Sequence, residues 1–173
     1  MHEAHAIERR RLVVEGIVQG VGFRPFVHRL ALRHGLGGFA LNDGRGVLVE
    51  VEGQTRALDS FAAALTRDVP ALARVDAVEV EPLAPRGEGG FRIEASAATS
   101  ATALIPPDAA TCDQCLRELW DPEDRRHRYP FINCTQCGPR FTIVRRPPYD
   151  RVNTTMSGFE MCETCRAEYE DPA

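Results

Sequence analysis

Lysine is absent from this 173-residue chain, and all 21 of its basic residues are arginines. A phosphate-binding loop of the Gly-x-x-x-x-Gly-Lys-Ser/Thr type needs that lysine, so a mononucleotide site of this type is excluded. Long hydrophobic runs are also missing, since no stretch approaches the roughly 20 apolar residues of a membrane-spanning helix. The formal net charge of −4 provides no general attraction to nucleic acid. The length allows one ordinary domain, or a small domain plus a metal-stapled module.

The N-terminus has only a superficial likeness to a secretory signal. Arg9, Arg10 and Arg11 precede an apolar run, but Glu15 and Gly16 interrupt that run and no small-residue cleavage site follows. We therefore expect a cytoplasmic protein. In that compartment, paired cysteines are better interpreted as metal ligands than as disulfides.

The most informative stretch of the first half is Gly16–Arg24, which reads GIVQGVGFR. It leaves a strand-like apolar run, crosses a glycine-bearing turn, and enters a segment with helical spacing that has Pro25 in its first turn. Backbone amides at such a turn converge on one concavity, where the helix dipole adds positive potential. Gly20 and Gly22 permit unusual dihedrals, and Arg24 adds a planar set of donors. These residues predict a phosphate or oxyanion cradle, although a glycine pair before a helix is about as often a plain turn.

Hydrophobic periodicity predicts a β-α-β-β-α-β order for residues 11–96. This order is the split βαβ arrangement of ferredoxin-like α+β folds. Residues 1–10 are polar and are expected to be disordered, and residues 97–107 have the composition of a linker. Residues 108–173 form the second predicted region, which is rich in cysteine.

The second region contains three Cys-x-x-Cys pairs. Each pair presents two thiolates on one side of a tight turn, which is half of a tetrahedral zinc site. The first two pairs have the spacing of a zinc ribbon, and the thioredoxin-like pattern of a redox pair is missing. His127 is a further candidate ligand, but it lies in an arginine-rich run typical of a solvated surface. The predicted ligands of structural zinc are Cys112, Cys115, Cys134, Cys137, Cys162 and Cys165.

An internal repeat links the two ends of this region. CDQCLRELWDP from Cys112 and CETCRAEYEDP from Cys162 match at an offset of 50 residues and share a glutamate, Glu118 or Glu168. Continued at that offset, the second copy would need cysteines beyond residue 173. We therefore expect the second finger to be incomplete and the chain to be a fragment or a natural truncation. The metal partners of Cys162 and Cys165 stay open.

Taken as a whole, GIVQGVGFR resembles the signature of acylphosphatases. The resemblance implies that Arg24 binds the substrate phosphate, that Asn42 in the segment GFALNDG positions the attacking water, and that this site needs no cofactor. Without the resemblance, Asn42 would be interpreted as a hairpin-turn residue before Asp43, and His28 as an ordinary helix residue. The phosphate-binding loop that the resemblance implies comprises Gln19, Gly20, Val21, Gly22, Phe23 and Arg24.

The cysteine region resembles the finger region of HypF carbamoyltransferases, which mature nickel–iron hydrogenases, in RYPFINCTQCGPRFTIV and PYDRVNTTMSGFEMCETC. The resemblance implies that the first domain releases carbamate from carbamoyl phosphate. It also implies that later domains, absent from this sequence, adenylate the carbamate and transfer the carbamoyl group to a partner, HypE, as a precursor of cyanide ligands. Carbamoyl transfer is therefore not expected from this chain alone.

Two other functions remain open from the sequence. The chain could be a stand-alone acylphosphatase whose zinc region is a protein-interaction module. Nucleic-acid binding through the ribbon is the other, although arginine runs are usually solvated faces. The basic residues that would carry it are Arg125, Arg126, Arg128, Arg145 and Arg146.

Overall fold

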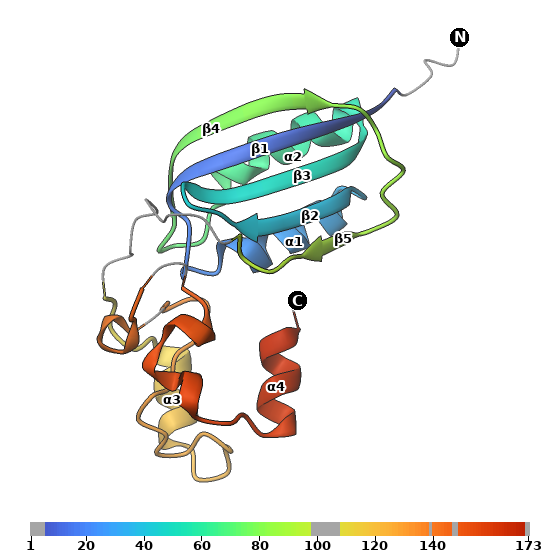
Figure 1. Cartoon of the computed structure of the whole chain (residues 1–173). Helices are drawn as coiled ribbons and strands as arrows, with labels where there is room; N and C mark the ends of the chain where they lie inside the picture. Colours follow the sequence, from blue (N-terminus) through green and yellow to red (C-terminus); the bar gives the residue numbers. More distant parts are fainter. Residues whose placement is uncertain (1–5, 98–107, 139, 147–148, 172–173) are drawn as a thin grey trace.

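The computed structural model describes residues 6–97, 108–138, 140–146 and 149–171 of the chain. It consists of a sheet domain (residues 6–97) and a finger region (residues 108–171), as Figure 1 shows. Residues 98–107 of the predicted linker lie outside the described residues. The elements of the sheet domain are β1 (Ile7–Ile17), α1 (Phe23–Arg33), β2 (Gly37–Asn42), β3 (Gly46–Gln54), α2 (Thr55–Arg67), β4 (Arg74–Leu83) and β5 (Phe91–Ile93). Those of the finger region are α3 (Asp113–Trp120), α4 (Glu163–Glu170) and three short 3-10 turns at Phe141–Ile143, Arg151–Asn153 and Thr155–Gly158.

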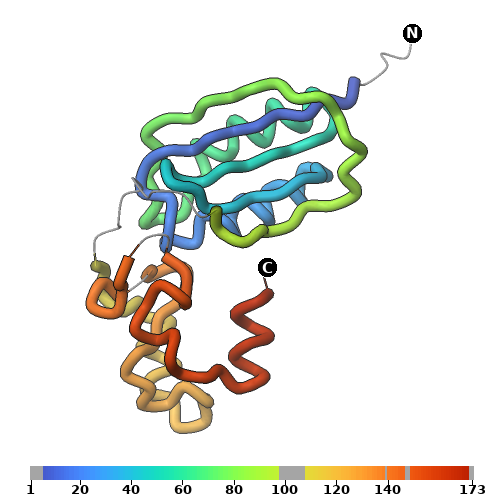
Figure 2. Tube along the Cα trace, in the orientation of Figure 1, coloured from blue at the N-terminus to red at the C-terminus, as the bar shows by residue number. Residues whose placement is uncertain are grey.

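The predicted ferredoxin-like α+β fold is confirmed. The five strands form one sheet in the order β4-β1-β3-β2-β5. Strands β2 and β5 are parallel, whereas the other neighbouring strands are antiparallel. Helices α1 and α2 both cover one face of the sheet (Figure 1). The Cα trace in Figure 2 shows that the finger region lies next to the end of the sheet at which β1 leads into α1.

The hydrophobic core lies between the sheet and the two helices. Alternation along the strands and helical spacing in α1 and α2 place the apolar side chains of both layers in this space. Leu12 and Val14 of β1 are buried beside Val47 and Val49 of β3. Helical spacing brings apolar side chains of α1 and α2 onto this layer, where each fully buried large side chain contributes about 1.5–3 kcal/mol. The helix residues of the core are Phe23, Phe26, Val27, Leu30, Ala31, Leu58, Phe61, Ala64 and Leu65.

The prediction of a disordered N-terminus through residue 10 is wrong from Ile7 onward, because β1 begins there. Arg9 is only 1% exposed, although its charge suggested a solvated tail. Its guanidinium forms ion pairs with Glu50 at 2.5 Å, Glu52 at 3.4 Å and Glu88 at 3.2 Å. Cross-strand pairing on the sheet face that carries no helix therefore orders a segment that has no hydrophobic pattern of its own.

The two strand glutamates of this cluster are held ionised by their partners. Burial by itself would raise the pKa of Glu50, but hydrogen bonds from Arg9 and Arg11 outweigh burial and lower it. For Glu52, the backbone amide of Arg86 is the largest contribution to a lowered pKa, and it acts together with Gly87 and Arg9. The cluster thus also fixes the segment between β4 and β5 against the sheet.

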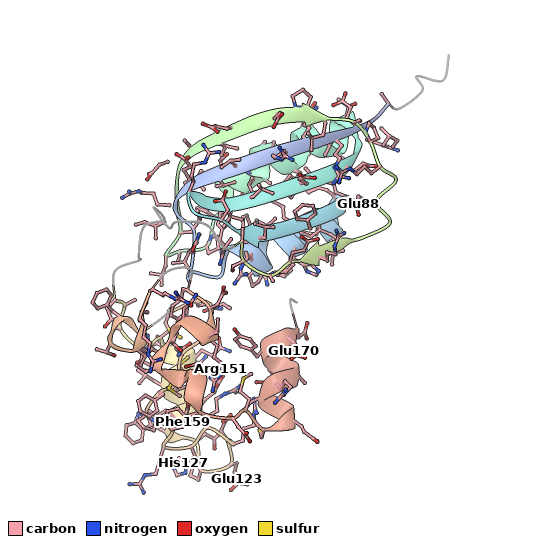
Figure 3. All side chains as sticks on the ribbon, viewed as in Figure 1. Glu88, Glu123, His127, Arg151, Phe159 and Glu170 are labelled. Atoms are coloured by element: carbon pink, nitrogen blue, oxygen red, sulfur yellow. The ribbon has the colours of Figure 1, made fainter. Side chains whose placement is uncertain are left out.

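The two copies of the internal repeat have the same local structure. Helices α3 and α4 are both eight residues long. Each begins directly after a cysteine with an extended backbone, Cys112 for α3 and Cys162 for α4. The two shared glutamates, Glu118 and Glu168, accept hydrogen bonds from the same side chain, Arg126. In Figure 3, Glu123 and His127 lie on the part of the finger region farthest from the sheet. Within the described ranges, no helix has the length and apolar character that crossing a bilayer requires.

The arginine cluster yields a prediction about stability. Replacing Arg9 with Met should lower the free energy of unfolding by about 3 kcal/mol. The reason is that Glu52 and the Oε2 atom of Glu50 are left buried without their cation, whereas Arg11 still binds Oε1 of Glu50. Urea denaturation at pH 7 measures this, with Arg67→Met as the control, since Arg67 pairs with Asp68 on the exposed surface.

The pH dependence of that difference is fixed by the lowered pKa values of Glu50 and Glu52. Their stabilisation is complete above the pKa of an unfolded glutamate, about 4.3, and is lost as the pH falls through the folded values. The gap between wild type and Arg9→Met should therefore narrow below about pH 4. A gap that stays constant down to pH 2 would contradict the proposed role of the cluster.

Candidate functional site

The candidate site begins at the glycine loop (residues 18–22), which connects β1 to α1. Gly20 and Gly22 have φ angles of 73° and 74°, a left-handed conformation that favours glycine. Val18 and Val21 are buried in the hydrophobic core and anchor the loop to it. The loop therefore has a fixed shape at the N-terminus of α1, where free backbone amides and the helix dipole favour an anion.

Gln19 ties the glycine loop to the turn after β2. Its amide nitrogen donates to the backbone oxygens of Asp43, at 2.9 Å, and Gly46, at 2.6 Å. The turn itself is closed by Asp43, whose carboxylate accepts from the backbone amides of Arg45 and Gly46. Gln19 was expected only as part of the phosphate loop, but its side chain fixes the position of the neighbouring strand end.

Asn42 lies at that strand end and not in the hairpin turn. It is 1% exposed, and neither its Oδ1 nor its Nδ2 atom has a hydrogen-bond partner among the described residues. A buried amide without partners is costly unless a water or ligand satisfies it. Asn42, Gly20, Gly22 and Arg24 line one cleft of about 430 Å³, so the structure brings the predicted site residues together.

The other wall of this cleft comes from the finger region. Thr135 and Gly138, in and directly after the second Cys-x-x-Cys turn, both line it. A Cβ atom on Gly22 would lie 2.8 Å from the backbone oxygen of Thr135, and one on Gly138 would lie 3.0 Å from the oxygen of Gly20. The cysteine turn is therefore packed against the glycine loop, and both contact points require glycine.

Arg24 also contacts the finger region. Its Nη2 atom forms an ion pair with Asp150 Oδ1 at 2.8 Å, and Asp150 Oδ2 accepts a hydrogen bond from the Ser96 hydroxyl at 2.5 Å. Both charged side chains are about one-fifth exposed. Sequence reasoning did not find Asp150, Ser96, Thr135 or Gly138 as site residues. Asp150 is 126 residues from Arg24, and its only sequence signal was its place in the PYDRVNTTMSGFEMCETC segment.

Four of the six predicted metal ligands form one cluster: Cys112, Cys115, Cys134 and Cys137, whose sulfur atoms all lie within 4.8 Å of one another. The Cys112–Cys134 distance is 3.7 Å, and the Cys115–Cys137 and Cys134–Cys137 distances are 3.9 Å. Tetrahedral zinc with Zn–S bonds of about 2.3 Å needs sulfur atoms about 3.8 Å apart, whereas a disulfide needs about 2 Å. The cluster therefore fits a structural zinc site.

The surroundings of the cluster favour at least one thiolate. Burial would raise the pKa of Cys137, but hydrogen bonds from the backbone at Cys112 and Cys134 and from Arg140 lower it to about 6. Burial raises the pKa of Cys115. Metal binding requires deprotonated sulfur, so the lowered pKa of Cys137 assists binding and a bound cation would supply the remaining stabilisation.

Cys162, Cys165 and His127 lie outside this cluster. Cys162 is exposed and Cys165 is half-buried, with Arg125 donating to its sulfur at 3.3 Å. The structure thus gives these two cysteines no ligand partners within the described residues. His127 is exposed, as its arginine-rich surroundings led us to expect.

Comparison with known proteins matches both parts of the chain. The Acylphosphatase family matches residues 10–93, and the HypF finger family matches residues 111–144. The chain is 56% identical over 164 residues to a carbamoyltransferase HypF of Rhodobacter capsulatus, covering 94% of this chain and 22% of that protein. It is 47% identical over 83 residues to an acylphosphatase of Thermus thermophilus, covering 47% of this chain and 92% of that protein.

A solved structure is similar over both parts. Full-length HypF in a phosphate- and nucleotide-bound form superimposes with a TM-score of 0.89 at 42% identity, covering 99% of this chain and 23% of that one. The chain therefore spans about a fifth of the length of the HypF relatives that it matches.

The cysteine geometry yields a prediction about metal content. The purified chain should bind one equivalent of zinc, and Cys115→Ser should abolish that binding, because Cys115 is a buried member of the four-sulfur cluster. Cys165→Ser is the matched control and should keep full metal content. Metal analysis, with the thiolate charge-transfer absorption after cobalt substitution, measures both. Loss of metal in the control would contradict a site made of the first four cysteines alone.

Proposed function

Because this chain belongs to the acylphosphatase family and its finger region is homologous to that of HypF carbamoyltransferases, we propose that its sheet domain hydrolyses acyl phosphates. Carbamoyl phosphate is the proposed substrate. The observation that supports this best is the convergence of the glycine loop, Arg24 and the unpartnered Asn42 amide on one cleft.

The proposed roles follow from what the reaction requires. A carboxyl–phosphate mixed anhydride has a good leaving group, so the site needs neither a strong acid nor a covalent nucleophile. It needs stabilisation of charge on the phosphate oxygens and a positioned water. The loop amides and Arg24 supply the first, with Gln19, Gly20, Val21, Gly22 and Phe23 forming the proposed cradle.

Asn42 supplies the second requirement. Its neutral amide can hold a water through Oδ1 while Nδ2 donates to a phosphate oxygen. The water attacks phosphorus, the bond from phosphorus to the acyl oxygen breaks, and the carbamate leaves with its electron pair. A phosphate oxygen or the departing carbamate takes the proton of the water, since a neutral amide is a poor base. No metal takes part in these steps, and the proposed zinc has a structural role.

The wider role of the chain is proposed from HypF homology. As part of a carbamoyltransferase it would supply carbamate for the synthesis of cyanide ligands in hydrogenase maturation, with a HypE-like protein as partner and the cytoplasm as location. The sheet domain would be the hydrolase unit and residues 108–173 the finger unit.

The alternatives have less support from the structure. A finger region that only binds partners would not need to contact Arg24 and line the same cleft as Asn42. Nucleic-acid binding would need free arginines, but Arg125 and Arg126 pair with Glu168 and Glu118. Support for nucleic-acid binding would require RNA or DNA binding by the chain that weakens steeply with rising salt concentration.

The deciding experiment is phosphate release from carbamoyl phosphate and from acetyl phosphate by the purified chain. Arg24→Gln should lower kcat/KM by about 100-fold or more, because a charged donor at the phosphate is lost. Arg29→Gln is the matched control, since Arg29 is exposed on the same helix. Absence of phosphate release from both substrates in the wild type would reject the hydrolase proposal for this chain.

Asn42 should act on a different kinetic parameter. Asn42→Ala should lower kcat by about 100-fold and leave the binding of inorganic phosphate within a few-fold of wild type, because the water is no longer positioned while the charged donor Arg24, which contributes more to anion binding than the neutral Nδ2, is retained. Asn133→Ala, on the finger wall of the same cleft, is the control. An Asn42→Ala variant with unchanged kcat would remove Asn42 from the mechanism.

A further inference from the structure

Arg24 reaches the cleft on a long, flexible side chain. Asp150 is its only hydrogen-bond partner among the described residues, and it uses one of the two Nη groups. Asp150 lies outside both matched regions, residues 10–93 and 111–144, so neither family match assigns it a role. The contact therefore raises the question of what a carboxylate does on the proposed phosphate-binding arginine.

We propose that Asp150 is a positioning residue that holds the Arg24 guanidinium in place for the phosphate, so that the finger region completes the hydrolytic site. The inference rests on the proposed function of Arg24. Asp150 does not touch the substrate in this proposal; it acts through Arg24.

The hydrogen bonding on both sides of Asp150 supports a fixed position. The Ser96 hydroxyl holds its second carboxylate oxygen, and Ser96 lies next to Ala97, whose amide donates to the backbone oxygen of Asn42 at 2.8 Å. The backbone oxygen of Asp150 accepts from the amide of Asn153 at 2.8 Å. Apart from Arg24, the carboxylate is therefore held at its backbone and at one oxygen, which gives a flexible cation a fixed partner.

The donor count shows that positioning and phosphate binding are compatible. A guanidinium carries five N–H donors in a fixed plane. Asp150 accepts from Nη2 only, so Nε and Nη1 have no partner among the described residues and can serve the phosphate. A prearranged arginine binds an anion more tightly because less side-chain entropy is lost on binding.

If Asp150 instead competed with phosphate for Arg24, its removal would have the opposite effect on phosphate binding. A carboxylate beside an anion site also repels a dianion, so an internal competitor would weaken phosphate binding and its removal would strengthen it. Positioning predicts that removal weakens binding. The sign of a single measurement therefore separates the two roles.

The test measures binding of inorganic phosphate by calorimetry in the purified chain. Asp150→Ala should raise the phosphate Kd about three- to tenfold, and Ser96→Ala should raise it less, because it frees only one oxygen of Asp150. Asp150→Asn should stay closer to wild type than Asp150→Ala, since its amide oxygen still accepts from Arg24. The control is Asp59→Ala, which removes an arginine–aspartate pair of 2.7 Å on the surface of α2.

Turnover of carbamoyl phosphate provides the second readout. KM should rise in parallel with the phosphate Kd in Asp150→Ala, whereas kcat should change less. Unchanged or tighter phosphate binding in Asp150→Ala overturns the proposal. Equal weakening in the Ala and Asn variants together with loss of bound zinc also overturns it, because the role is then structural.

The two proposals can fail separately. Phosphate binding that depends on Asp150 without any turnover rejects the hydrolase function and keeps the positioning role. Turnover that is indifferent to Asp150 keeps the hydrolase function and rejects positioning. A wild type that neither binds phosphate nor releases it from either acyl phosphate overturns both.

Discussion

The constraint on which the site depends is the left-handed backbone of the glycine loop. Gly20 and Gly22 adopt φ angles that other residues rarely tolerate, and this shape is the basis of the proposed anion cradle before α1. Such a loop needs support from outside, because its own backbone makes few regular hydrogen bonds. Val18 and Val21 provide it from the core, Gln19 from the β2–β3 turn, and the Thr135 turn from the finger region.

Arginine side chains have two different roles in the sheet domain, one on the open face of the sheet and one beside the glycine loop. In the buried cluster around Arg9, several carboxylates share a cation and the result is rigidity. At the glycine loop, by contrast, Arg24 has a single carboxylate partner within the described part of the chain, so its other N–H donors stay available for an anion. The planar guanidinium makes both uses possible, since its donors can be divided among several acceptors in fixed directions.

The sequence predicted the parts of the structure that depend on local patterns. Alternation and helical spacing predicted the β-α-β-β-α-β order of the sheet domain, and the spacing of the first two Cys-x-x-Cys pairs identified the four cysteines that cluster. Arg9 was missed because a polar segment can be ordered by partners 41 and 43 residues away, which periodicity does not detect. The finger wall of the cleft was missed for the same reason, since nothing in the residues near Arg24 indicates a contact with Asp150.

The reciprocal glycine contacts make the finger region part of the site and not an appended module. Gly138 approaches the oxygen of Gly20, and Gly22 approaches the oxygen of Thr135, so neither surface can shift without opening the other. Because Thr135 lies between Cys134 and Cys137, a metal at the four cysteines would fix the turn that presses on the glycine loop. A structural metal at these cysteines would therefore be coupled to the proposed anion site through a few backbone atoms, although no metal ligand belongs to the proposed chemistry.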